Sequence, residues 1–588
     1  MESLKDLDKG PETQVGGTVA DLLIQYLEML GVEYVFGIPG GAIEPLYNAL
    51  ARSARRGSVR PVVARHESGA AFMADGYSTR SGRLGVCCAT TGPGVTNLVT
   101  GVASAYANQI PMLVITAQTA LPTFGRGAFQ ESSCTGINTL GILAHCTRYN
   151  TLVSHVEQFE QKLVSALMTA YSSPPGPVHL SIPVDVMRAG IKPGTARFDL
   201  ANLMKRPQLA DQEAIKSCCR LLERSDKTVF VIGEGATEAI GDVLTLASRL
   251  RAKLVTTPHG KGLVSPYHPH YYGVVGFAGH TSARELLADP ALDTVVCIGT
   301  RMGEWASNGW DTELLLNSRM IHIDEQDSNF IYTPMARLHV RGRILTVIEQ
   351  LDAHFRARPA EVFDHASERR MQRLLVHDDE VGFHDDATPI KPQRLMRELP
   401  RIFPANTRYF ADVGASFAWA IHYLHPYDRR IMGHRSNNGV LFRACLEFSS
   451  MGWAIGCAVG SALARPGEPV VCITGDGSML MSGQEITVAV EMKLPVIFVV
   501  LNDAGLGMVR HGQRMAGAEQ VAVDMPATDF AAMARAMGAQ GYAIYSPADL
   551  QALADEPIRQ YPGPTLLDVH VDMEAVPPIS MRIRTLQR

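Results

Sequence analysis

Two acidic side chains follow two neighbouring predicted strands in the last third of the chain. A β-branched apolar run over 470–474 ends at a Gly-Asp-Gly turn that contains Asp476, and a second apolar run over 496–501 precedes Asp503. A helical pattern over 482–492 lies between them, which predicts a βαβ unit. Because a right-handed parallel crossover brings both strand ends to one edge of the sheet, we expect Asp476 and Asp503 to converge.

Two converging carboxylates require a positive charge between them. Mg²⁺ prefers hard oxygen ligands and commonly completes its shell with phosphate oxygens. Gly477 and Ser478 open the predicted helix, where free backbone N–H groups favour a diphosphate. Two unrelated Asp-Gly turns that only cap their strands are the alternative, since such turns are common after strands.

Glu67 is the second candidate for chemistry. It follows a predicted strand over 59–64 and precedes the small residues Gly69, Ala70 and Ala71. Most glutamates at such positions are surface residues that cap a helix. Here the small neighbours offer little polar surface, so we expect the Glu67 carboxyl to be desolvated.

The elements that must position these residues alternate between strands and helices. This alternation recurs in three stretches of the chain and predicts the α/β fold class, with three doubly wound parallel-sheet domains. We place the domains at 1–188, 208–354 and 391–575. A length of 588 residues suits three domains of ordinary size. The stretches 189–207 and 356–388 are interpreted as linkers.

Composition limits the functional classes. Apolar residues make up 46% and charged residues 19%, and the net charge of −5 argues against a nucleic-acid surface. The ten cysteines include no CxxC pair, which is typical of reduced thiols. We find neither an apolar run of membrane-spanning length nor a signal-peptide core. We therefore expect a cytoplasmic enzyme with no nucleic-acid or membrane partner.

The segment from Gly475 to Asp503 resembles the signature of the thiamine-diphosphate enzymes. The resemblance implies that Mg²⁺ is held by Asp476, Asp503 and the Gly505 carbonyl. Asp503 stands where the family usually has Asn, which adds a negative charge but keeps an oxygen ligand. The stretch 65–118 is similar to the first domain of the acetolactate-synthase group. In that group a glutamate at the position of Glu67 bonds the cofactor's aminopyrimidine ring and promotes its activation.

The same resemblance implies further site residues. Cofactor contacts are expected from Pro39, Gly41, Ala42 and Asn97 on the pyrimidine side, and from Gly414, Ala415, Ser416, Met451, Gly475, Gly477, Ser478, Leu506, Gly507 and Met508. Phe129 and Gln130 belong to a GxxAFQE-like loop that faces the reacting end of the cofactor in the family, and Arg301 matches a substrate-carboxylate arginine. His511 is the one candidate proton carrier. A structural role is the alternative for several of these residues. Phe129 and Gln130 could only pack in a loop, Met451 could only fill the core, and Arg301 could be a surface residue.

Three departures from the family concern the diphosphate, the acceptor and the central domain. Ala415-Ser416 replaces Gln-His, although Ser416 can still donate a hydrogen bond, and Gly512 replaces a tryptophan that shapes the acceptor pocket. The family's central domain carries FAD. The lone GxG at 233–235 is a weak nucleotide signal, and the usual acidic stretch is replaced at 302–305. FAD is possible there, but these departures argue against it.

The resemblance implies an enzyme that decarboxylates a 2-oxo acid, most simply pyruvate, and joins the product to a second carbonyl compound. It needs thiamine diphosphate and Mg²⁺. In the family the pyrimidine domain of one subunit faces the diphosphate domain of another, so we expect a homodimer or homotetramer. Two alternatives stay open: a 2-oxo-acid decarboxylase or acyloin lyase/ligase with a different acceptor, and a cofactor-binding regulatory paralogue without catalysis.

Overall fold

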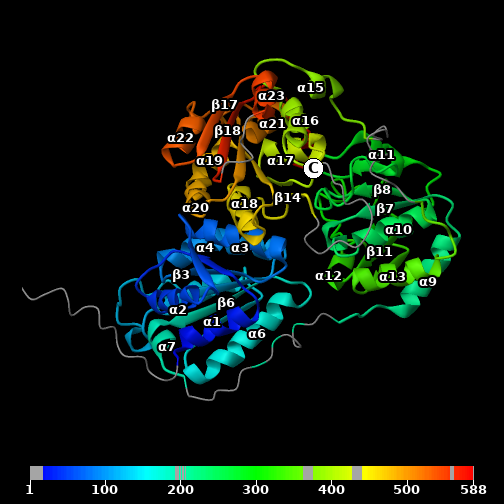
Figure 1. The fold of residues 1–588 in the computed structure, drawn as a ribbon. Helices are drawn as coiled ribbons and strands as arrows, with labels where there is room; N and C mark the ends of the chain where they lie inside the picture. Colours follow the sequence, from blue (N-terminus) through cyan, green and yellow to red (C-terminus); the bar gives the residue numbers. More distant parts are fainter. Residues whose placement is uncertain are drawn as a thin grey trace, which may run out of the picture. The chain divides into compact units, whose positions relative to one another are not determined.

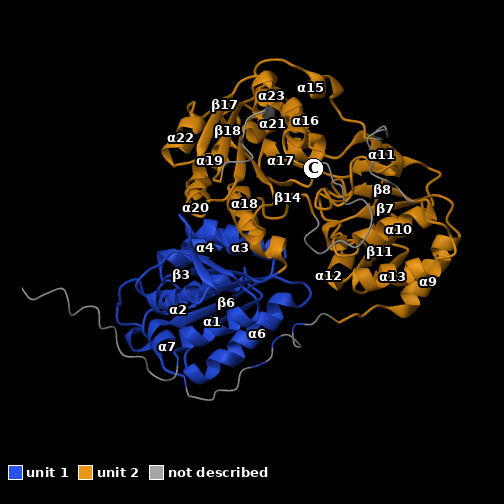
Figure 2. Cartoon of the chain, in the orientation of Figure 1, with its two compact units in different colours: residues 1–74, 83–205 blue, residues 75–82, 206–588 orange. Residues whose placement is uncertain are grey.

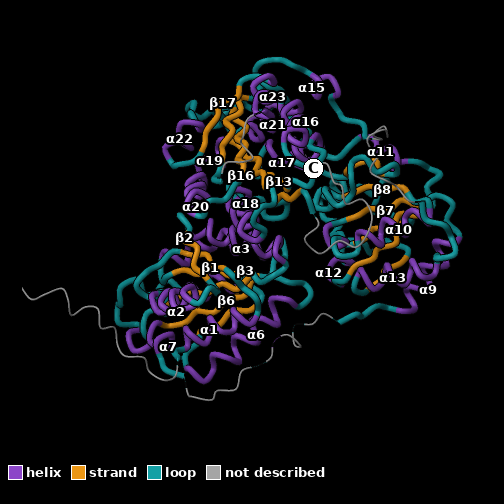
Figure 3. Tube along the Cα trace, viewed as in Figure 1, coloured by secondary structure: helices purple, strands orange, loops and turns teal. Residues whose placement is uncertain are grey.

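Three parallel sheets organise the chain. The computed structural model describes residues 17–191, 198, 200, 204, 207–361, 375–426, 440–555 and 562–586. Within them the strands form three sheets of six, in which every pairing of named strands is parallel and helices cover the sheets (Figures 1 and 3). Their buried Val-, Ile- and Leu-rich strands are typical of parallel sheets covered on both faces. The predicted α/β class with three doubly wound sheets is confirmed.

The first sheet has the order β2-β1-β3-β4-β6-β5. Its strands are β1 (Tyr34–Gly37), β2 (Arg60–Val63), β3 (Gly85–Ala89), β4 (Met112–Gln118), β5 (Tyr149–Leu152) and β6 (Pro177–Pro183). Its helices are α1 (Val19–Met29), α2 (Glu44–Arg55), α3 (Glu67–Ser81), α4 (Pro93–Ala107), α5 (Thr139–Ala144), α6 (Phe159–Tyr171) and α7 (Val184–Arg188). The glycine-rich stretch over 90–97 favours a turn, but the turn ends at Gly92: Gly92, with φ 64°, is the N-cap, and Pro93 begins α4.

The central sheet has the order β12-β11-β10-β7-β8-β9. Its strands are β7 (Thr228–Ile232), β8 (Lys253–Thr256), β9 (Tyr271–Val274), β10 (Thr294–Ile298), β11 (Met320–Asp324) and β12 (Leu338–Arg341). Its helices are α9 (Gln212–Glu223), α10 (Ile240–Leu250), α11 (Thr281–Ala288), α12 (Asp327–Phe330) and α13 (Ile344–His354).

The last sheet has the order β14-β13-β15-β16-β18-β17. Its strands are β13 (Arg408–Ala411), β14 (Phe442–Ala444), β15 (Val470–Gly475), β16 (Val496–Asn502), β17 (Gln540–Ile544) and β18 (Thr565–His570). Its helices are α16 (Pro392–Ile402), α17 (Ala415–Tyr423), α18 (Trp453–Ala464), α19 (Asp476–Ser482), α20 (Ile486–Glu491), α21 (Gly507–Met515), α22 (Phe530–Ala536), α23 (Pro547–Asp555) and α24 (Ser580–Leu586); α15 (Glu380–His384) precedes them.

The single helix expected over 482–492 is wrong. The helix α19 begins at Asp476, directly after β15, and ends at Ser482, and a 3₁₀ turn over Gly483–Glu485 separates it from α20. Gly483 lies close to the α19 side chains, because a Cβ there would come within 2.5 Å of the Met479 Sδ atom. The backbone of Ser482, with φ −136° and ψ 6°, leaves the helical conformation, and Gly483, a weak helix former, begins the 3₁₀ turn.

Contacts divide the chain into two compact units (Figure 2). The first comprises residues 1–74 and 83–205 and holds the first sheet; the second comprises 75–82 and 206–588 and holds the other two sheets. Most of the expected linker over 189–207, and the part of the second linker over 362–374, lie outside the described residues. Among the described helices, none combines the length and the apolar character needed to cross a bilayer.

Candidate functional site

The second unit contains a pocket at the carboxyl ends of the strands of its last sheet. Its volume is about 180 Å³, and segments that follow β13, β15, β16 and β18 line it. The strand order reverses between β13 and β15, and ligands bind at such switch points in open α/β sheets. The lining includes the residues predicted for this domain: Gly414, Ala415, Ser416, Met451, Gly475, Asp476, Gly477, Ser478, Asp503, Gly505, Leu506, Gly507, Met508 and His511.

Asp476 and Asp503 bring two carboxylates into this pocket. Asp476 is 3% exposed, and its carboxylate accepts hydrogen bonds from the backbone N–H groups of Gly477 (2.7 Å) and Gly505 (3.0 Å). Burial raises the pKa of Asp476 despite these bonds. Burial and the nearby charge of Asp476 raise the pKa of Asp503 to about 7. Two neighbouring carboxyl groups that are costly to ionise form a donor set suited to a divalent cation.

Glycines let the loop after β16 close around these carboxylates. A Cβ on Gly507 would lie 2.5 Å from the Asp503 Oδ2 atom, and one on Gly505 would lie 2.0 Å from the Arg510 Nη2 atom. Gly414 and Gly475, which follow or end other strands, have no atom of a described, non-adjacent residue within 4 Å of an added Cβ, so backbone there is open to a ligand. The pocket therefore combines tight support for Asp503 in the loop after β16 with open backbone at Gly414 and Gly475.

The buried polar atoms of the pocket are unevenly satisfied. In the described part of the chain, neither the Ser478 Oγ nor the His511 Nδ1 atom has a hydrogen-bond partner. The His511 Nε2 atom lies 3.1 Å from the Met573 carbonyl oxygen, which can only accept a hydrogen bond. Burial, then Arg514, lowers the pKa of His511, so the ring is neutral and Nδ1 carries a free lone pair. Buried polar atoms left in this way are suited to bind a ligand.

The predicted cofactor contacts Ser416 and Met451 have different surroundings in the pocket. The Ser416 hydroxyl donates to the carbonyl oxygen of Asp412, which precedes α17, at 2.7 Å, and its contact with a diphosphate stays a prediction. Met451 lines the pocket beside Gly477, where an added Cβ would lie 3.3 Å from the Met451 Cε atom. Its position is consistent with an apolar support beneath a bound ring.

In the first unit, Glu67 begins α3 directly after the segment that follows β2. The side chain is 8% exposed, as its small neighbours predict, and its Oε2 atom accepts a hydrogen bond from the Asn97 amide at 2.9 Å. Asn97 lies on α4, and a Cβ on Gly94 of the same helix would be 3.4 Å from the Glu67 Oε1 atom. The starts of α3 and α4 thus place one carboxylate and one amide together.

Two other predicted segments, the turn over 39–42 and the loop at 129–130, contact the turn at 90–92, which precedes α4. An added Cβ on Gly40 would lie 2.7 Å from the Thr90 Cβ atom, which brings the turn of Pro39, Gly41 and Ala42 beside it. The Thr91 hydroxyl donates to the Gln130 carbonyl oxygen at 3.0 Å. Gln130 has φ 56°, an unusual backbone conformation for a residue with a side chain. Phe129, at 86% exposed, extends away from the packed core of the unit.

Arg301 is the predicted residue that the second unit does not bring into the pocket. It follows β10 in the central sheet, and its Nε atom lies 4.0 Å from the Glu447 Oε1 atom. The expected meeting of Arg301 with a substrate carboxylate stays a prediction.

Sequence reasoning missed the groups that support Asp503. Arg510, which is 4% exposed, lies 3.4 Å from the Asp503 carboxylate and 3.1 Å from that of Asp524. An isolated bridge pairs Gly505 with Asp524, which brings this distant loop beside the carboxylates. Asp412 was also missed: its carboxylate accepts bonds from the Gly452 N–H (2.8 Å) and the Thr474 hydroxyl (3.1 Å). The only sequence signal was a charged residue just after strand β13.

Comparison with known families agrees with this geometry. Residues 17–137 match the N-terminal TPP binding domain of thiamine pyrophosphate enzymes, residues 215–351 match the central domain, and residues 412–569 match the C-terminal TPP binding domain. The chain therefore belongs to the thiamine pyrophosphate enzyme family, as its sequence predicted.

Its relatives include acetolactate synthases. It is 31% identical to the probable acetolactate synthase large subunit of Methanocaldococcus jannaschii over 573 residues, which cover 95% of this chain and 93% of the relative. It is 30% identical to the acetolactate synthase isozyme 1 large subunit of Escherichia coli (strain K12), with 95% and 94% covered. It is 31% identical to the acetolactate synthase of Arthrospira platensis, with 94% of each covered.

Proposed function

We propose that this protein decarboxylates a 2-oxo acid, most simply pyruvate, and joins the product to a second carbonyl compound, with thiamine diphosphate and Mg²⁺ as cofactors. The observation that carries the proposal is the pair Asp476 and Asp503 in one pocket with the Gly505 backbone. Similarity to acetolactate synthases over 95% of the chain supports the carboligation step. FAD takes no part in the proposed reaction.

The chain's residues have distinct roles in this proposal. Asp476, Asp503 and the Gly505 carbonyl would hold Mg²⁺, and the Ser478 hydroxyl would donate to the diphosphate. Thiamine diphosphate supplies, when bound, a nucleophilic carbon and a sink for the electrons released with carbon dioxide. Glu67 would form a hydrogen bond with the pyrimidine ring, while the Asn97 amide donates to its Oε2 atom at 2.9 Å. His511 would accept a proton or hydrogen bond at its free Nδ1 atom.

Gly512 supports a second candidate, a 2-oxo-acid decarboxylase or an acyloin lyase/ligase with a non-standard acceptor. It stands where acetolactate synthases of branched-chain synthesis carry a tryptophan. Among the described residues, only the Ile583 Cδ1 atom lies within 4 Å of an added Cβ, at 3.8 Å. The missing tryptophan side chain would leave the acceptor side of the site less restricted.

The test is an incubation of the purified protein with pyruvate, thiamine diphosphate and Mg²⁺, followed by product analysis. Acetolactate supports the carboligase, whereas acetaldehyde or a mixed acyloin supports the second candidate. The Asp476→Ala variant is the control, because it removes a proposed metal ligand from a buried site. If neither pyruvate nor a panel of other 2-oxo acids releases carbon dioxide, the protein is a non-catalytic paralogue.

Glu67 and the proposed metal ligands belong to different compact units, and we propose that each active site draws on two subunits of a homodimer or homotetramer. Mixing inactive Glu67→Gln and Asp476→Ala variants under conditions of subunit exchange tests this. One of the two sites in each hybrid dimer would be intact, so activity should return to about a quarter of the wild-type value. No recovery, with exchange shown by mass labels, would place both groups of one site in one chain.

A further inference from the structure

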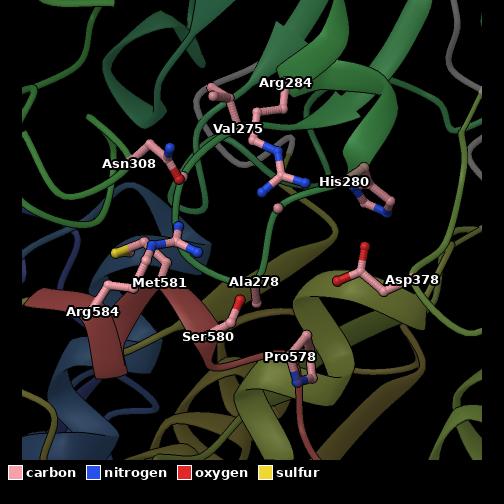
Figure 4. Close-up of a pocket in the computed structure, with 12 residues that line it drawn as sticks. Val275, Ala278, His280, Arg284, Asn308, Asp378, Pro578, Ser580, Met581 and Arg584 are labelled. Carbon is pink, nitrogen blue, oxygen red and sulfur yellow. The ribbon is translucent and has the colours of Figure 1, made fainter. Parts of the chain in front are cut away.

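A second, polar pocket lies in the second unit, outside the site just described. Segments distant in sequence line it: α11 and its preceding loop, the 308 region, Asp378, and α24 near the end of the chain. Figure 4 shows the guanidinium groups of Arg284, from α11, and Arg584, from α24, extending into the same space. Ser580 and Asn308 lie beside them, and His280 and Asp378 lie at the other side.

The two guanidinium groups are not neutralised by the protein. Within the described residues, neither Arg284 nor Arg584 makes an ion pair, and Arg284 reaches only the Thr281 hydroxyl, at 3.5 Å. Arg582 provides the contrast within the same helix, because it pairs with Glu304 at 2.6 Å. Asp378 accepts a hydrogen bond from Thr281 at 3.1 Å, so its carboxylate is engaged at the edge of the pocket. The pocket therefore has a surplus of positive charge.

Its size limits the ligand. The cavity volume is about 30 Å³, whereas one buried water needs about 10–15 Å³. This space accepts a small oxyanion or the anionic end of a larger molecule, but not a whole nucleotide. Arginines bind phosphoryl oxygens through paired N–H groups, and two of them on separate elements suit a tetrahedral group better than a planar one.

The geometry points to a binding site for a phosphoryl group, either free phosphate or the phosphate of a small monoester. The bound group would link α24 to α11, and so fix the end of the chain on the central domain. Arg582 and Thr585 already hold α24 there through Glu304, at 2.6 and 2.7 Å. The segment just before α24, which includes Asp572 and Met573, lines the candidate active site. Phosphoryl binding would therefore restrain one wall of that site.

Calorimetric titration of the protein loaded with thiamine diphosphate and Mg²⁺ tests this site. Loading keeps the proposed diphosphate site filled, so it cannot take up the probe. Inorganic phosphate and glycerol phosphate are titrated separately at constant ionic strength, with chloride as the reference anion. Saturable binding of phosphate alone identifies the free ion as the ligand, and tighter binding of glycerol phosphate identifies a monoester. Absence of saturable binding with both would refute the site.

Single variants show whether the binding occurs in this pocket. Arg284→Gln and Arg584→Gln should each weaken phosphate binding about tenfold or more, because each removes charged hydrogen bonds. Arg584→Lys keeps the charge but loses the paired donors, and should fall between Arg584→Gln and the wild type. Arg220→Gln on α9 removes the same charge from an exposed position bonded to Ser217, and should leave the affinity unchanged. Equal affinity in all four variants would overturn the assignment.

A further measurement separates this inference from folding and from the proposed reaction. Phosphate should raise the melting temperature of the wild type and of Arg220→Gln, but not of a folded Arg284→Gln/Arg584→Gln double variant. No substrate or turnover enters this measurement or the calorimetric titration. Phosphate binding without carbon dioxide release from any 2-oxo acid would thus refute the proposed function and support the phosphoryl site. Turnover without phosphate binding would support the proposed function and refute the phosphoryl site.

Discussion

Replacing Asp503 by asparagine should change how the stability of the metal-free protein depends on pH. Burial and the charge of Asp476 raise the pKa of Asp503 from 3.8 to about 7 in the folded protein. Between these two values the folded state holds a proton that the unfolded state releases. The free energy of unfolding therefore falls as pH rises through this window, by up to about 4 kcal/mol once Asp503 is fully ionised. The neutral amide of the Asp503→Asn variant would carry no such penalty.

Metal binding should show the opposite trend. A carboxylate must lose its proton before it binds a cation, so the apparent Mg²⁺ affinity of the wild type should fall as pH drops below about 7. In Asp503→Asn the pH dependence of Mg²⁺ affinity that comes from residue 503 disappears, although Asp476 can still gain or lose a proton in both proteins. The variant should therefore bind Mg²⁺ more weakly than the wild type at pH 8, and the difference should narrow towards pH 6.

The assay is urea unfolding of both proteins between pH 5 and pH 8, first with EDTA and then with Mg²⁺ and thiamine diphosphate. The readout is the difference in free energy of unfolding between the two proteins. In this difference, the contributions of ionisable groups that behave alike in both proteins cancel. Arg510→Gln is the matched control: it removes the charge 3.4 Å from Asp503 and should extend the loss of stability to higher pH. Identical pH profiles for the wild type and Asp503→Asn with EDTA would refute this account of the site.

Four further predictions concern other parts of the molecule. Glu67→Gln should keep thiamine-diphosphate binding but lose most turnover; turnover near the wild-type rate would remove Glu67 from the mechanism. His511→Phe should lower kcat about 100-fold with an unchanged cofactor Kd, since it removes the free Nδ1 acceptor, and an unchanged kcat would exclude proton transfer there. Asp412→Asn should cost about 1–3 kcal/mol in urea unfolding, because its amide nitrogen would face either the Gly452 N–H and the Thr474 hydroxyl, which both donate to Oδ2, or the Val413 N–H, which donates to Oδ1. The purified protein should lack a flavin absorbance spectrum, and a yellow protein would contradict this.

Strong apolar periodicity made much of the fold predictable. The strands at 228–232 and 294–298 and the helix at 159–171 have the bounds that their sequence pattern indicates. The errors occur where tertiary packing or backbone conformation overrides the pattern. The α4 helix begins at Pro93 because Gly92 adopts φ 64°, although Pro at the first helical position was a readable signal. The break between α19 and α20 occurs where Ser482 leaves the helical conformation, with φ −136°, which no local pattern reveals.

The part of the candidate site that could be predicted consists of the residues that directly follow strands. Asp476 and Asp503 follow β15 and β16, so parallel topology alone brings them to one edge. Their environment could not be predicted in this way. Asp524 reaches Arg510 only because a bridge pairs it with Gly505, and the phosphoryl pocket combines α11 with α24, which no sequence motif connects.

Charge balance explains why Asp503 can replace the asparagine that is usual in this family. An additional buried carboxylate beside Asp476 would repel both its neighbour and a diphosphate. Arg510 is 4% exposed and lies 3.4 Å from Asp503, so it offsets the added charge without occupying the face of Asp503 that lines the pocket. Arg510 also contacts the exposed Asp524, at 3.1 Å. The replacement is therefore coherent as a pair: in the proposed function the aspartate would remain an oxygen ligand, and the arginine would offset part of its charge in the metal-free pocket.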